Sequence, residues 1–330
     1  MIGRFTGLTD PGRRRRRNED VFVCEPPLFA VADGMGGAQA GEVAAGLAAA
    51  VLEEAHGDER GEERVASLIQ EANRRVFQRS SEDMAASGMG TTMTVALVDA
   101  AEGSIAVGHV GDSRAYRVRG EQLEQLTDDH SLVGELLRSG KLSPEEAESH
   151  PQRSVITRAL GTEPDVDVDT FTVPAEPGDV YLVCSDGLTS MVSDGEIQAL
   201  LVEMDDLDRA ARALVDAANA GGGEDNITVV LFEIAGSVEG EAEVEQTATM
   251  PAVDEPADDD EDTLSGLEPV PAVDTAVIPA ELIQEHLQRV EAEAETEPRP
   301  QQQRRKLLPL LALLLLLLAI ALLTSWGLSR

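Results

Sequence analysis

Apolar and polar positions divide the first 236 residues of the chain into short strands and longer helices. Residues 21–24 and 28–32 are apolar runs rich in β-forming side chains, a pattern typical of a β-hairpin. Because strands and helices occur in groups, the order of elements predicts an α+β fold with antiparallel sheets and helices outside them. Further strands are predicted at residues 91–98, 104–110, 113–118, 180–184 and 227–234. Helices are predicted at residues 41–55, 62–81, 132–137, 194–202 and 207–220, with another beginning at Pro144.

The C-terminal segment from Leu307 to Trp326 carries no charge. A helix of this length spans roughly 30 Å, the thickness of the hydrocarbon core of a bilayer. It therefore predicts a single-pass transmembrane helix in the cell membrane, with residues 327–330 as a short extracytoplasmic tail. Three basic residues at 304–306 precede the segment. Since positive residues stay on the cytoplasmic side, we expect residues 1–306 to face the cytoplasm.

Residues 237–306 differ in composition from the segments on either side. Residues 237–305 hold 19 acidic and 4 basic side chains, and residues 258–262 are a continuous acidic run. Like charges repel and carry little apolar surface, so we expect a disordered linker after a catalytic domain at residues 1–236. Within the linker, apolar side chains at helical spacing in residues 279–295 indicate either a transient helix or one that docks on a partner.

The overall charge limits the classes of partner. The chain has 62 acidic and 26 basic side chains and a formal net charge of −36. Phosphate neutralisation needs a basic face, so this charge argues against nucleic acid as a partner. Hydrophobic residues make up 42% of the chain, which is enough for a packed core. The two cysteines, Cys24 and Cys184, lack CxxC spacing. Three histidines, His109, His130 and His150, lack the spacing of a metal motif. We therefore expect structural or surface roles for these residues.

Four aspartates share one setting, at the ends of predicted strands beside Gly or Asn. A single Asp-Gly pair usually marks a turn. Strand ends that meet at one edge of a sandwich would, however, bring the carboxylates together, and they would repel each other without a cation. Hard divalent cations take carboxylate and carbonyl oxygens, so the set predicts a metal site. Asp33, Asp186 and Asp225 adjoin predicted strands, and Asp112 lies in an expected hairpin turn between residues 104–110 and 113–118.

In their order along the chain, these segments resemble the protein phosphatase 2C family, the metal-dependent serine/threonine phosphatases, in its bacterial membrane-anchored form. The resemblance covers residues 5–235 and implies a four-layer αββα sandwich, with two antiparallel sheets flanked by helices and two Mn²⁺ or Mg²⁺ ions at one edge. The matching segments are Thr9-Asp10-Pro11-Gly12 through Arg15 to Asn18-Glu19-Asp20, Asp33-Gly34-Met35-Gly36-Gly37, Gly41-Glu42-Val43-Ala44, Gly88-Met89-Gly90-Thr91-Thr92, His109-Val110-Gly111-Asp112-Ser113-Arg114, Ser149-His150-Pro151-Gln152-Arg153-Ser154, Ser185-Asp186-Gly187-Leu188 and Asp225-Asn226-Ile227-Thr228-Val229.

The resemblance also implies roles for individual residues of the metal site. Asp33 would bridge both ions, and the carbonyl of Gly34 would hold the second ion. Asp186 would complete the second ion and Asp225 the first. Glu19 and Asp20 would hold metal-bound waters.

Two positions depart from the family pattern. Asp112 would help to hold a third ion, but Ser190 stands where the family often has the second aspartate, so the third ion stays open. Met35 stands where eukaryotic relatives carry a histidine proposed as general acid, so the proton must come from a metal-bound water or another group.

Arg15, within the run of arginines at 13–17, falls where the family places its phosphate-binding arginine.

The resemblance implies an active phosphatase in which a hydroxide bridging the two ions attacks phosphoserine or phosphothreonine directly. Residues 128–160 match the family's flap, where substrate choice is thought to lie. Membrane-bound bacterial members commonly oppose membrane Ser/Thr kinases, which implies such a kinase as partner. Two alternatives are a catalytically weak membrane-tethered scaffold (a pseudophosphatase), which the complete ligand set disfavours, and a two-metal nuclease, which the acidic surface disfavours.

Overall fold

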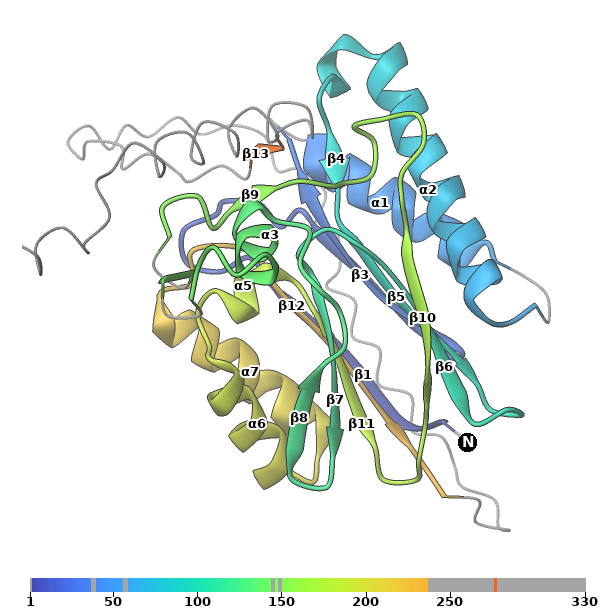
Figure 1. The fold of residues 1–330 in the computed structure, drawn as a ribbon, viewed down its shortest axis with the longest axis vertical. Helices are drawn as coiled ribbons and strands as arrows, with labels where there is room; N and C mark the ends of the chain where they lie inside the picture. Colours follow the sequence, from blue (N-terminus) through green and yellow to red (C-terminus); the bar gives the residue numbers. More distant parts are fainter. Residues whose placement is uncertain are drawn as a thin grey trace, which may run out of the picture. The chain divides into compact units, whose positions relative to one another are not determined.

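Two antiparallel β-sheets stack face to face in the computed structural model, and helices cover their outer faces (Figure 1). The structure describes residues 2–36, 40–55, 59–143, 146–147, 150–236 and 276–277. The α+β class and the two antiparallel sheets agree with the sequence-based expectation.

The first sheet has the strand order β1-β12-β11-β7-β8. Its strands are β1 (Ile2–Asp10), β12 (Ile227–Ile234), β11 (Val180–Cys184), β7 (Arg114–Arg119) and β8 (Gln122–Gln125). The second sheet has the order β10-β6-β5-β3-β2, with β4 paired to β3. Its strands are β10 (Asp169–Pro174), β6 (Ser104–Val110), β5 (Met93–Asp99), β3 (Leu28–Met35), β2 (Asp20–Glu25) and β4 (Gly90–Thr91).

Each outer face of the sandwich is covered by a pair of helices. The second sheet packs against α1 (Ala40–Glu53) and α2 (Glu62–Glu82), and the first sheet packs against α6 (Asp194–Glu203) and α7 (Leu207–Gly221). In α7 the buried side chains recur at helical spacing, so one apolar stripe faces the sheet. They are Leu207, Ala210, Ala211, Leu214, Val215 and Ala218.

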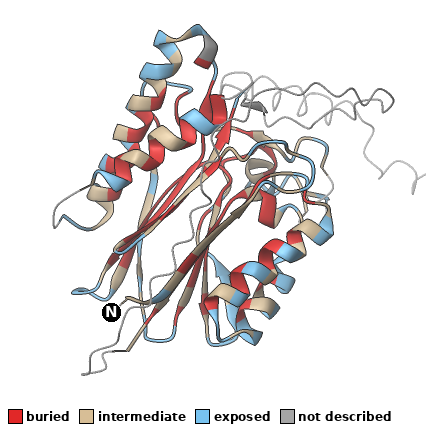
Figure 2. Ribbon diagram, turned by 180° about the vertical axis from the view of Figure 1, so that it is seen from behind, coloured by how far each residue is buried: buried red, intermediate tan, exposed pale blue. Residues whose placement is uncertain are grey.

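Buried residues run along the strands of both sheets (Figure 2), and one buried cluster contains residues of both sheets. Phe29 of the second sheet stacks on Phe232 of the first with ring centroids 4.1 Å apart, and Tyr181 also stacks on Phe232, at 5.1 Å. Offset aromatic pairs of this kind add about 0.5–1.5 kcal/mol beyond the area they bury. The aromatic stack therefore helps to hold the two sheets together.

The predicted hairpin between residues 104–110 and 113–118 is wrong. β6 pairs with β5 and β10 in the second sheet, whereas β7 pairs with β11 and β8 in the first. Gly111 has a φ of +115°, a value that favours glycine, and here the chain crosses from one sheet to the other. At Asp112, where a hairpin turn was expected, the chain therefore crosses from the second sheet to the first.

Five strands have no counterpart in the sequence-based prediction: β1, β8, β10 and the two-residue strands β9 (Val155–Ile156) and β13 (Ala276–Val277), the last of which lies in the expected linker. β1, β8 and β10 carry polar or glycine residues between their apolar ones, so none of them presents a continuous apolar run. β1 nevertheless pairs with β12 from Phe5 to Asp10 and ends beside the loop that carries Arg15. The predicted hairpin of residues 21–24 and 28–32 is confirmed as β2 and β3.

The remaining short elements lie among the loops at one edge of the sandwich. They are the 3-10 helix η1 (Met84–Ala86), α3 (Leu132–Arg138), α5 (Asp186–Thr189), β9 (Val155–Ile156) and β13 (Ala276–Val277), which pairs in parallel with β9. Within the described ranges, no helix has both the length and the apolar character needed to cross a bilayer. The predicted span at 307–326, the helix at 279–295, nearly all of the linker and the helix start at Pro144 lie outside the described residues.

Candidate metal and phosphate site

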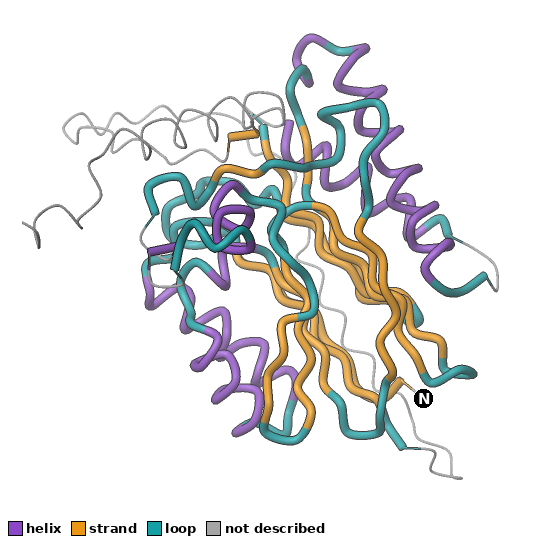
Figure 3. Tube along the Cα trace, viewed as in Figure 1, coloured by secondary structure: helices purple, strands orange, loops and turns teal. Residues whose placement is uncertain are grey.

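The predicted site residues come together at one edge of the sandwich, where strands of both sheets run into loops (Figure 3). Asp20 begins β2 and lies directly opposite Asp33 of β3 in the strand register. Asp186 follows β11 as the first residue of α5, and Asp225 lies two residues before β12. Asp112 occupies the crossing between β6 and β7. The structure therefore brings these carboxylates within electrostatic reach of one another at one edge of the sandwich.

Gly34 allows an unusually close backbone approach at this edge. Its amide donates to the carbonyl oxygen of Glu19 at 3.2 Å. A Cβ atom at Gly34 would lie only 2.2 Å from the carbonyl oxygen of Gly41, so a side chain has no room there. The glycine after Asp33 therefore lets β3, the residue before β2 and the start of α1 meet.

Asp20 is buried, and only one of its two carboxylate oxygens forms hydrogen bonds with the described residues. Its Oδ2 accepts hydrogen bonds from Ser185 Oγ at 2.8 Å and from Thr228 Oγ1 at 2.6 Å. Its Oδ1 is buried without any hydrogen-bond partner among the described residues. Burial raises the pKa of Asp20 to about 6, although the two hydroxyl hydrogen bonds act in the opposite direction. Asp20 is thus held in place by one oxygen while the other stays available.

Asp33 and Asp186 repel their neighbours strongly. Burial raises the pKa of Asp33 well above its usual value, and the charges of Asp20, Asp186, Asp225 and Asp112 raise it further. Burial likewise raises the pKa of Asp186, with added repulsion from Asp112, Asp225 and Asp20. Asp186 Oδ1 is also buried without a hydrogen-bond partner in the described part of the chain. Asp33 and Asp186 therefore share one electrostatic environment in which the neighbouring charges that act on them are negative.

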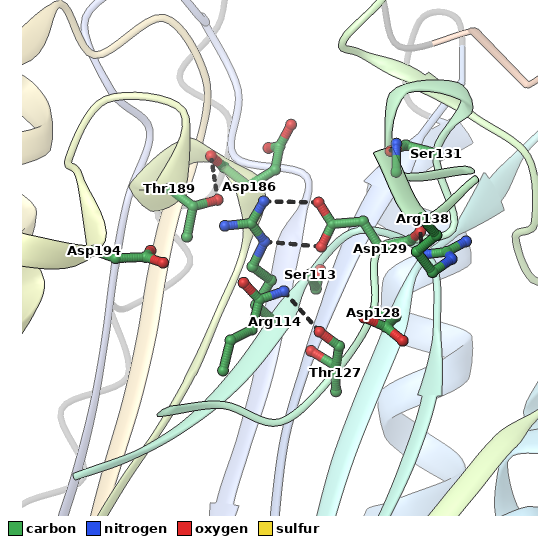
Figure 4. A network of polar contacts seen from close by, with 12 residues as sticks. Ser113, Arg114, Thr127, Asp128, Asp129, Ser131, Arg138, Asp186, Thr189 and Asp194 are labelled. Carbon is green, nitrogen blue, oxygen red and sulfur yellow. Dashed lines mark hydrogen bonds and ion pairs between the residues drawn. The ribbon is translucent and has the colours of Figure 1, made fainter. Parts of the chain in front are cut away.

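Asp112 is 7% exposed, and burial followed by the charge of Asp129 raises its pKa to about 7. Asp129 itself is bound by Arg114, whose guanidinium donates two hydrogen bonds to it at 2.8 and 2.7 Å. Figure 4 shows this fork, with Asp186 close to it. Arg114 is bound to Asp129, and its charge lowers the pKa of Asp112 without offsetting burial and the charge of Asp129.

Glu19 lies at the rim of the carboxylate cluster. Burial raises its pKa, the Arg15 charge lowers it, and the charges of Asp225 and Glu42 raise it. It is half-buried, so it faces both the cluster and solvent.

These oxygens suit a hard divalent cation such as Mg²⁺ or Mn²⁺. Carboxylate oxygens without hydrogen-bond partners and raised carboxyl pKa values are typical of a cluster whose negative charge is balanced by a bound cation. Across the described residues, no three His, Cys, Asp or Glu side chains form a ready-made metal cage. Mg²⁺ usually keeps several waters and takes only one or two carboxylates directly, so an open arrangement of this kind fits it.

Arg15 is joined directly to the cluster. Its Nη2 donates to Asp225 Oδ2 at 2.8 Å, and both side chains are 25% exposed. A guanidinium fork binds the oxygens of a phosphate group well, because it offers parallel donors in a fixed plane. The structure thus places a guanidinium group, which is suited to phosphate, beside the carboxylates.

Asn226 is a residue whose role the sequence analysis did not identify. Its Oδ1 accepts from the amide of Glu19 at 2.8 Å, and its Nδ2 donates to the carbonyl oxygens of Arg17 at 2.8 Å and Pro11 at 3.1 Å. One buried amide therefore ties the loop that carries Arg15 to the segment that carries Asp225. The sequence signal for this role was the position of Asn226 directly after Asp225, a candidate metal ligand.

The histidines have the structural roles expected of them. His109 is 1% exposed, and its Nδ1 lies 2.9 Å from Thr94 Oγ1. Burial and the neighbouring His130 lower the pKa of His109 to about 3, so its ring is neutral at physiological pH. His130 Nδ1 accepts from the amide of Gly111 at 3.0 Å, and burial lowers its pKa too. His150 Nδ1 accepts from the amide of Gln152 in a local turn.

Met35 has an apolar role. It is 6% exposed and packs with Ile156 and Ala159, two residues of the expected flap. The position after Asp33-Gly34 therefore holds an apolar contact to the flap, which agrees with the expectation that it supplies no proton.

Comparisons with known proteins point in the same direction. A family profile described as protein phosphatase 2C matches residues 18–225. A serine/threonine phosphatase stp of Listeria monocytogenes is 44% identical over 237 residues, which are 68% of this chain and 93% of that protein. The crystal structure of the Mycobacterium tuberculosis serine/threonine phosphatase PstP/Ppp has a TM-score of 0.68 and 37% identity, and covers 72% of this chain and 100% of that one.

A further solved structure carries metal. It is the catalytic domain of the serine/threonine protein phosphatase PstP in complex with two manganese ions, with a TM-score of 0.64 and 34% identity. The match covers 71% of this chain and 99% of that one.

Proposed function

Because the chain belongs to the protein phosphatase 2C family, we propose that it is an active, metal-dependent protein serine/threonine phosphatase that hydrolyses phosphoserine and phosphothreonine. The observation that carries this proposal is the convergence of unneutralised carboxylates next to Arg15 at one sandwich edge. Such strongly perturbed acids with a specific charge partner are typical of functional sites.

The residues would act as follows. Asp33, the Gly34 carbonyl, Asp186 and Asp225 would hold two Mn²⁺ or Mg²⁺ ions. When bound, two such ions supply charge neutralisation and activate water as the nucleophile for phosphoryl transfer.

The neighbouring residues would complete the site. Glu19 and Asp20 would orient water molecules at the rim of the metal site, and Arg15 would bind the phosphate oxygens and hold the phosphorus in line for attack. Asp112 would take part in a weaker third site. Ser190, which is exposed, offers no carboxylate to complete that third site.

The alternative is a membrane-tethered pseudophosphatase that localises partners without turnover. The structure keeps every carboxylate that the resemblance assigns to the metals, and buried oxygens of Asp20 and Asp186 are left without partners among the described residues. A scaffold without catalysis would gain nothing from such repulsion, so the intact cluster favours the enzyme.

The test is hydrolysis of a phosphothreonine peptide by the full-length chain with Mn²⁺, followed as released phosphate. We expect turnover that EDTA abolishes and that Asp186→Asn lowers by at least about a hundredfold. Metal-dependent binding of the phosphopeptide without turnover by the wild type would favour the pseudophosphatase instead.

We also propose that the phosphatase is tethered to the membrane by residues 307–326, with residues 1–306 in the cytoplasm, where it opposes membrane Ser/Thr kinases. The uncharged 307–326 segment after a basic triplet supports this topology. Tethering would raise the local concentration of the phosphatase near such kinases without new contacts. A chain ending at residue 306 should move to the soluble fraction and keep its peptide hydrolysis; retention in the membrane fraction would contradict the tether.

A further inference from the structure

The most concentrated positive charge of the chain lies beside the carboxylate cluster. Residues 13–17 are five consecutive arginines in a chain with a formal net charge of −36. We call this segment the arginine loop; it lies between β1 and β2. All of its arginines except Arg15 are exposed.

The backbone of the arginine loop is fixed to the segment that carries Asp225. The amides of Arg13 and Arg14 both donate to the carbonyl oxygen of Gly223, at 2.8 and 3.1 Å. Just before the loop, Gly12 has a φ of +75°, and a Cβ atom there would lie 2.2 Å from the carbonyl oxygen of Asp225. At its other end, the carbonyl oxygen of Arg17 accepts from Asn226 Nδ2. The arginines are therefore held at a fixed place beside the site.

The side chains of the arginine loop divide into two groups. Arg15 is half-buried and binds Asp225, as a phosphate-binding residue of the site would. Arg13 donates from Nε to the carbonyl oxygen of Asn219 at 3.0 Å. Arg14 and Arg16 are exposed and form no side-chain hydrogen bond or ion pair with any part of the chain that the structure describes. These two cations are available to a bound polypeptide next to the phosphate position.

Resting on the proposed phosphatase activity, we propose that the arginine loop selects phosphorylated segments that carry acidic side chains next to the phosphoresidue. An extended peptide advances about 3.3 Å per residue, so the neighbours of a phosphoresidue held by Arg15 pass within reach of residues only one position away in the loop. The strongly acidic remainder of the protein repels acidic peptides, and the arginine loop reverses that field locally. Charge complementarity of this kind sets specificity more than total affinity.

The experiment compares two phosphothreonine peptides that differ only at the two residues on each side of the phosphothreonine, Asp in one and Asn in the other. Full-length protein is assayed with Mn²⁺ at low salt and at 0.5 M NaCl. Exposed charge pairs are individually weak and are screened by salt, so we expect kcat/KM to favour the Asp peptide by about fivefold at low salt and by less than about twofold at high salt.

Two variant pairs assign the effect to the loop. Arg14→Gln with Arg16→Gln should bring the ratio of the two kcat/KM values to about one, whereas Arg14→Lys with Arg16→Lys should keep it, because the charge is retained. A matched control removes the same charge from exposed positions of α7, with Arg209→Gln and Arg212→Gln, and should keep both the ratio and the activity. A third peptide, with a second phosphothreonine in place of one Asp, shows whether any nearby anion suffices.

The outcomes separate this inference from the proposed function. Equal kcat/KM for the Asp and Asn peptides, a preference that survives in the glutamine pair, or an equal loss in the α7 control would overturn the inference while leaving the phosphatase activity intact. A preference for the second phosphate alone would also overturn it, since acidic side chains would then not be recognised. If no phosphopeptide is hydrolysed under any condition, the proposed function itself fails.

Discussion

Two groups of buried or half-buried aspartates lie within the same sandwich, and they differ in whether an arginine is bound to them. Asp179, 1% exposed, accepts two hydrogen bonds from Arg119 at 2.8 and 2.7 Å and another from the amide of Glu176. Burial alone would raise its pKa, but these partners lower it below its usual value. Asp129 has an equivalent fork from Arg114. We call Asp129 and Asp179 the paired acids.

The unpaired acids are Asp20, Asp33, Asp112 and Asp186. None of them forms an ion pair with a cation in the described ranges, and burial raises the pKa of each one. A buried carboxylate without a cation costs several kcal/mol unless it binds a proton or a metal. The unpaired acids therefore destabilise the folded chain when no cation is bound. A requirement for a bound cation explains why they lie together. The paired acids, in contrast, need nothing from outside the chain.

Replacing one unpaired acid should show the largest effect. Asp33→Asn removes the carboxylate at the centre of the cluster, so we expect kcat/KM for a phosphothreonine peptide to fall by about a thousandfold or more. The same substitution relieves repulsion, so the free energy of unfolding in EDTA should rise by about 1 kcal/mol. Peptide kinetics and urea unfolding measure the two effects. A variant that keeps a tenth of the activity, or loses stability in EDTA, would break the distinction between the two groups.

Metal binding should stabilise the protein through the unpaired acids. A ligand at a hundred times its Kd stabilises the folded state by about 2.7 kcal/mol for each site. We therefore expect Mn²⁺ to raise the Tm of the wild type and EDTA to reverse the increase. Asp186→Asn should lose most of this response, whereas Asp179→Asn should keep it. Differential scanning calorimetry with and without Mn²⁺ provides the measurement, and an equal response of both variants would contradict the assignment.

Replacing a paired acid should affect stability and leave catalysis intact. Asp179→Asn removes the partner of Arg119, which is one-third exposed and still contacts Glu176 and the Pro174 carbonyl. Because Arg119 keeps these contacts and some water, we expect a loss of about 2 kcal/mol, less than for a fully buried pair. Urea unfolding measures the loss. The kcat/KM for a phosphothreonine peptide should stay within about twofold, and a larger change would show that Asp179 serves the site.

The sequence allowed Asp33, Asp112, Asp186 and Asp225 to be identified because each lies at the end of a predicted strand, whereas Asp20 was expected only from the family resemblance. Asp33, Asp186 and Asp225 adjoin runs that predict strands on their own, and strand ends of a sandwich meet at its edge. Their exact neighbours could not be derived in this way. The register that places Asp20 opposite Asp33 depends on pairing across the whole of β2 and β3, which local periodicity does not encode.

Other features depend on contacts between distant segments. The crossing at Gly111 looks like a hairpin turn in sequence, and only the pairing of β7 with β11 distinguishes the two. The apolar residues of β1 are separated by glycine and polar residues, so its strand conformation depends on pairing with β12. Asn226 joins residues more than 200 positions away in the chain. No local pattern announces contacts of this kind, although they hold the arginine loop and Glu19 in place.

The smallest expected effect is a pH dependence of the free energy of unfolding. It comes from the buried His109 and not from the unpaired acids. The folded-state pKa of His109 is lowered to about 3 by burial and by His130, while an unfolded histidine titrates near 6.5. Between these values the unfolded chain binds a proton that the folded chain does not, so the free energy of unfolding should fall as pH decreases. From pH 7 to pH 5.5 this amounts to about 1 kcal/mol. The unpaired acids have raised pKa values and the opposite sign, so saturating Mn²⁺ is needed to keep them ionised. Urea unfolding at both pH values should show a smaller decrease for His109→Gln than for the wild type, and an identical decrease in the two proteins would show that His109 is not the group responsible.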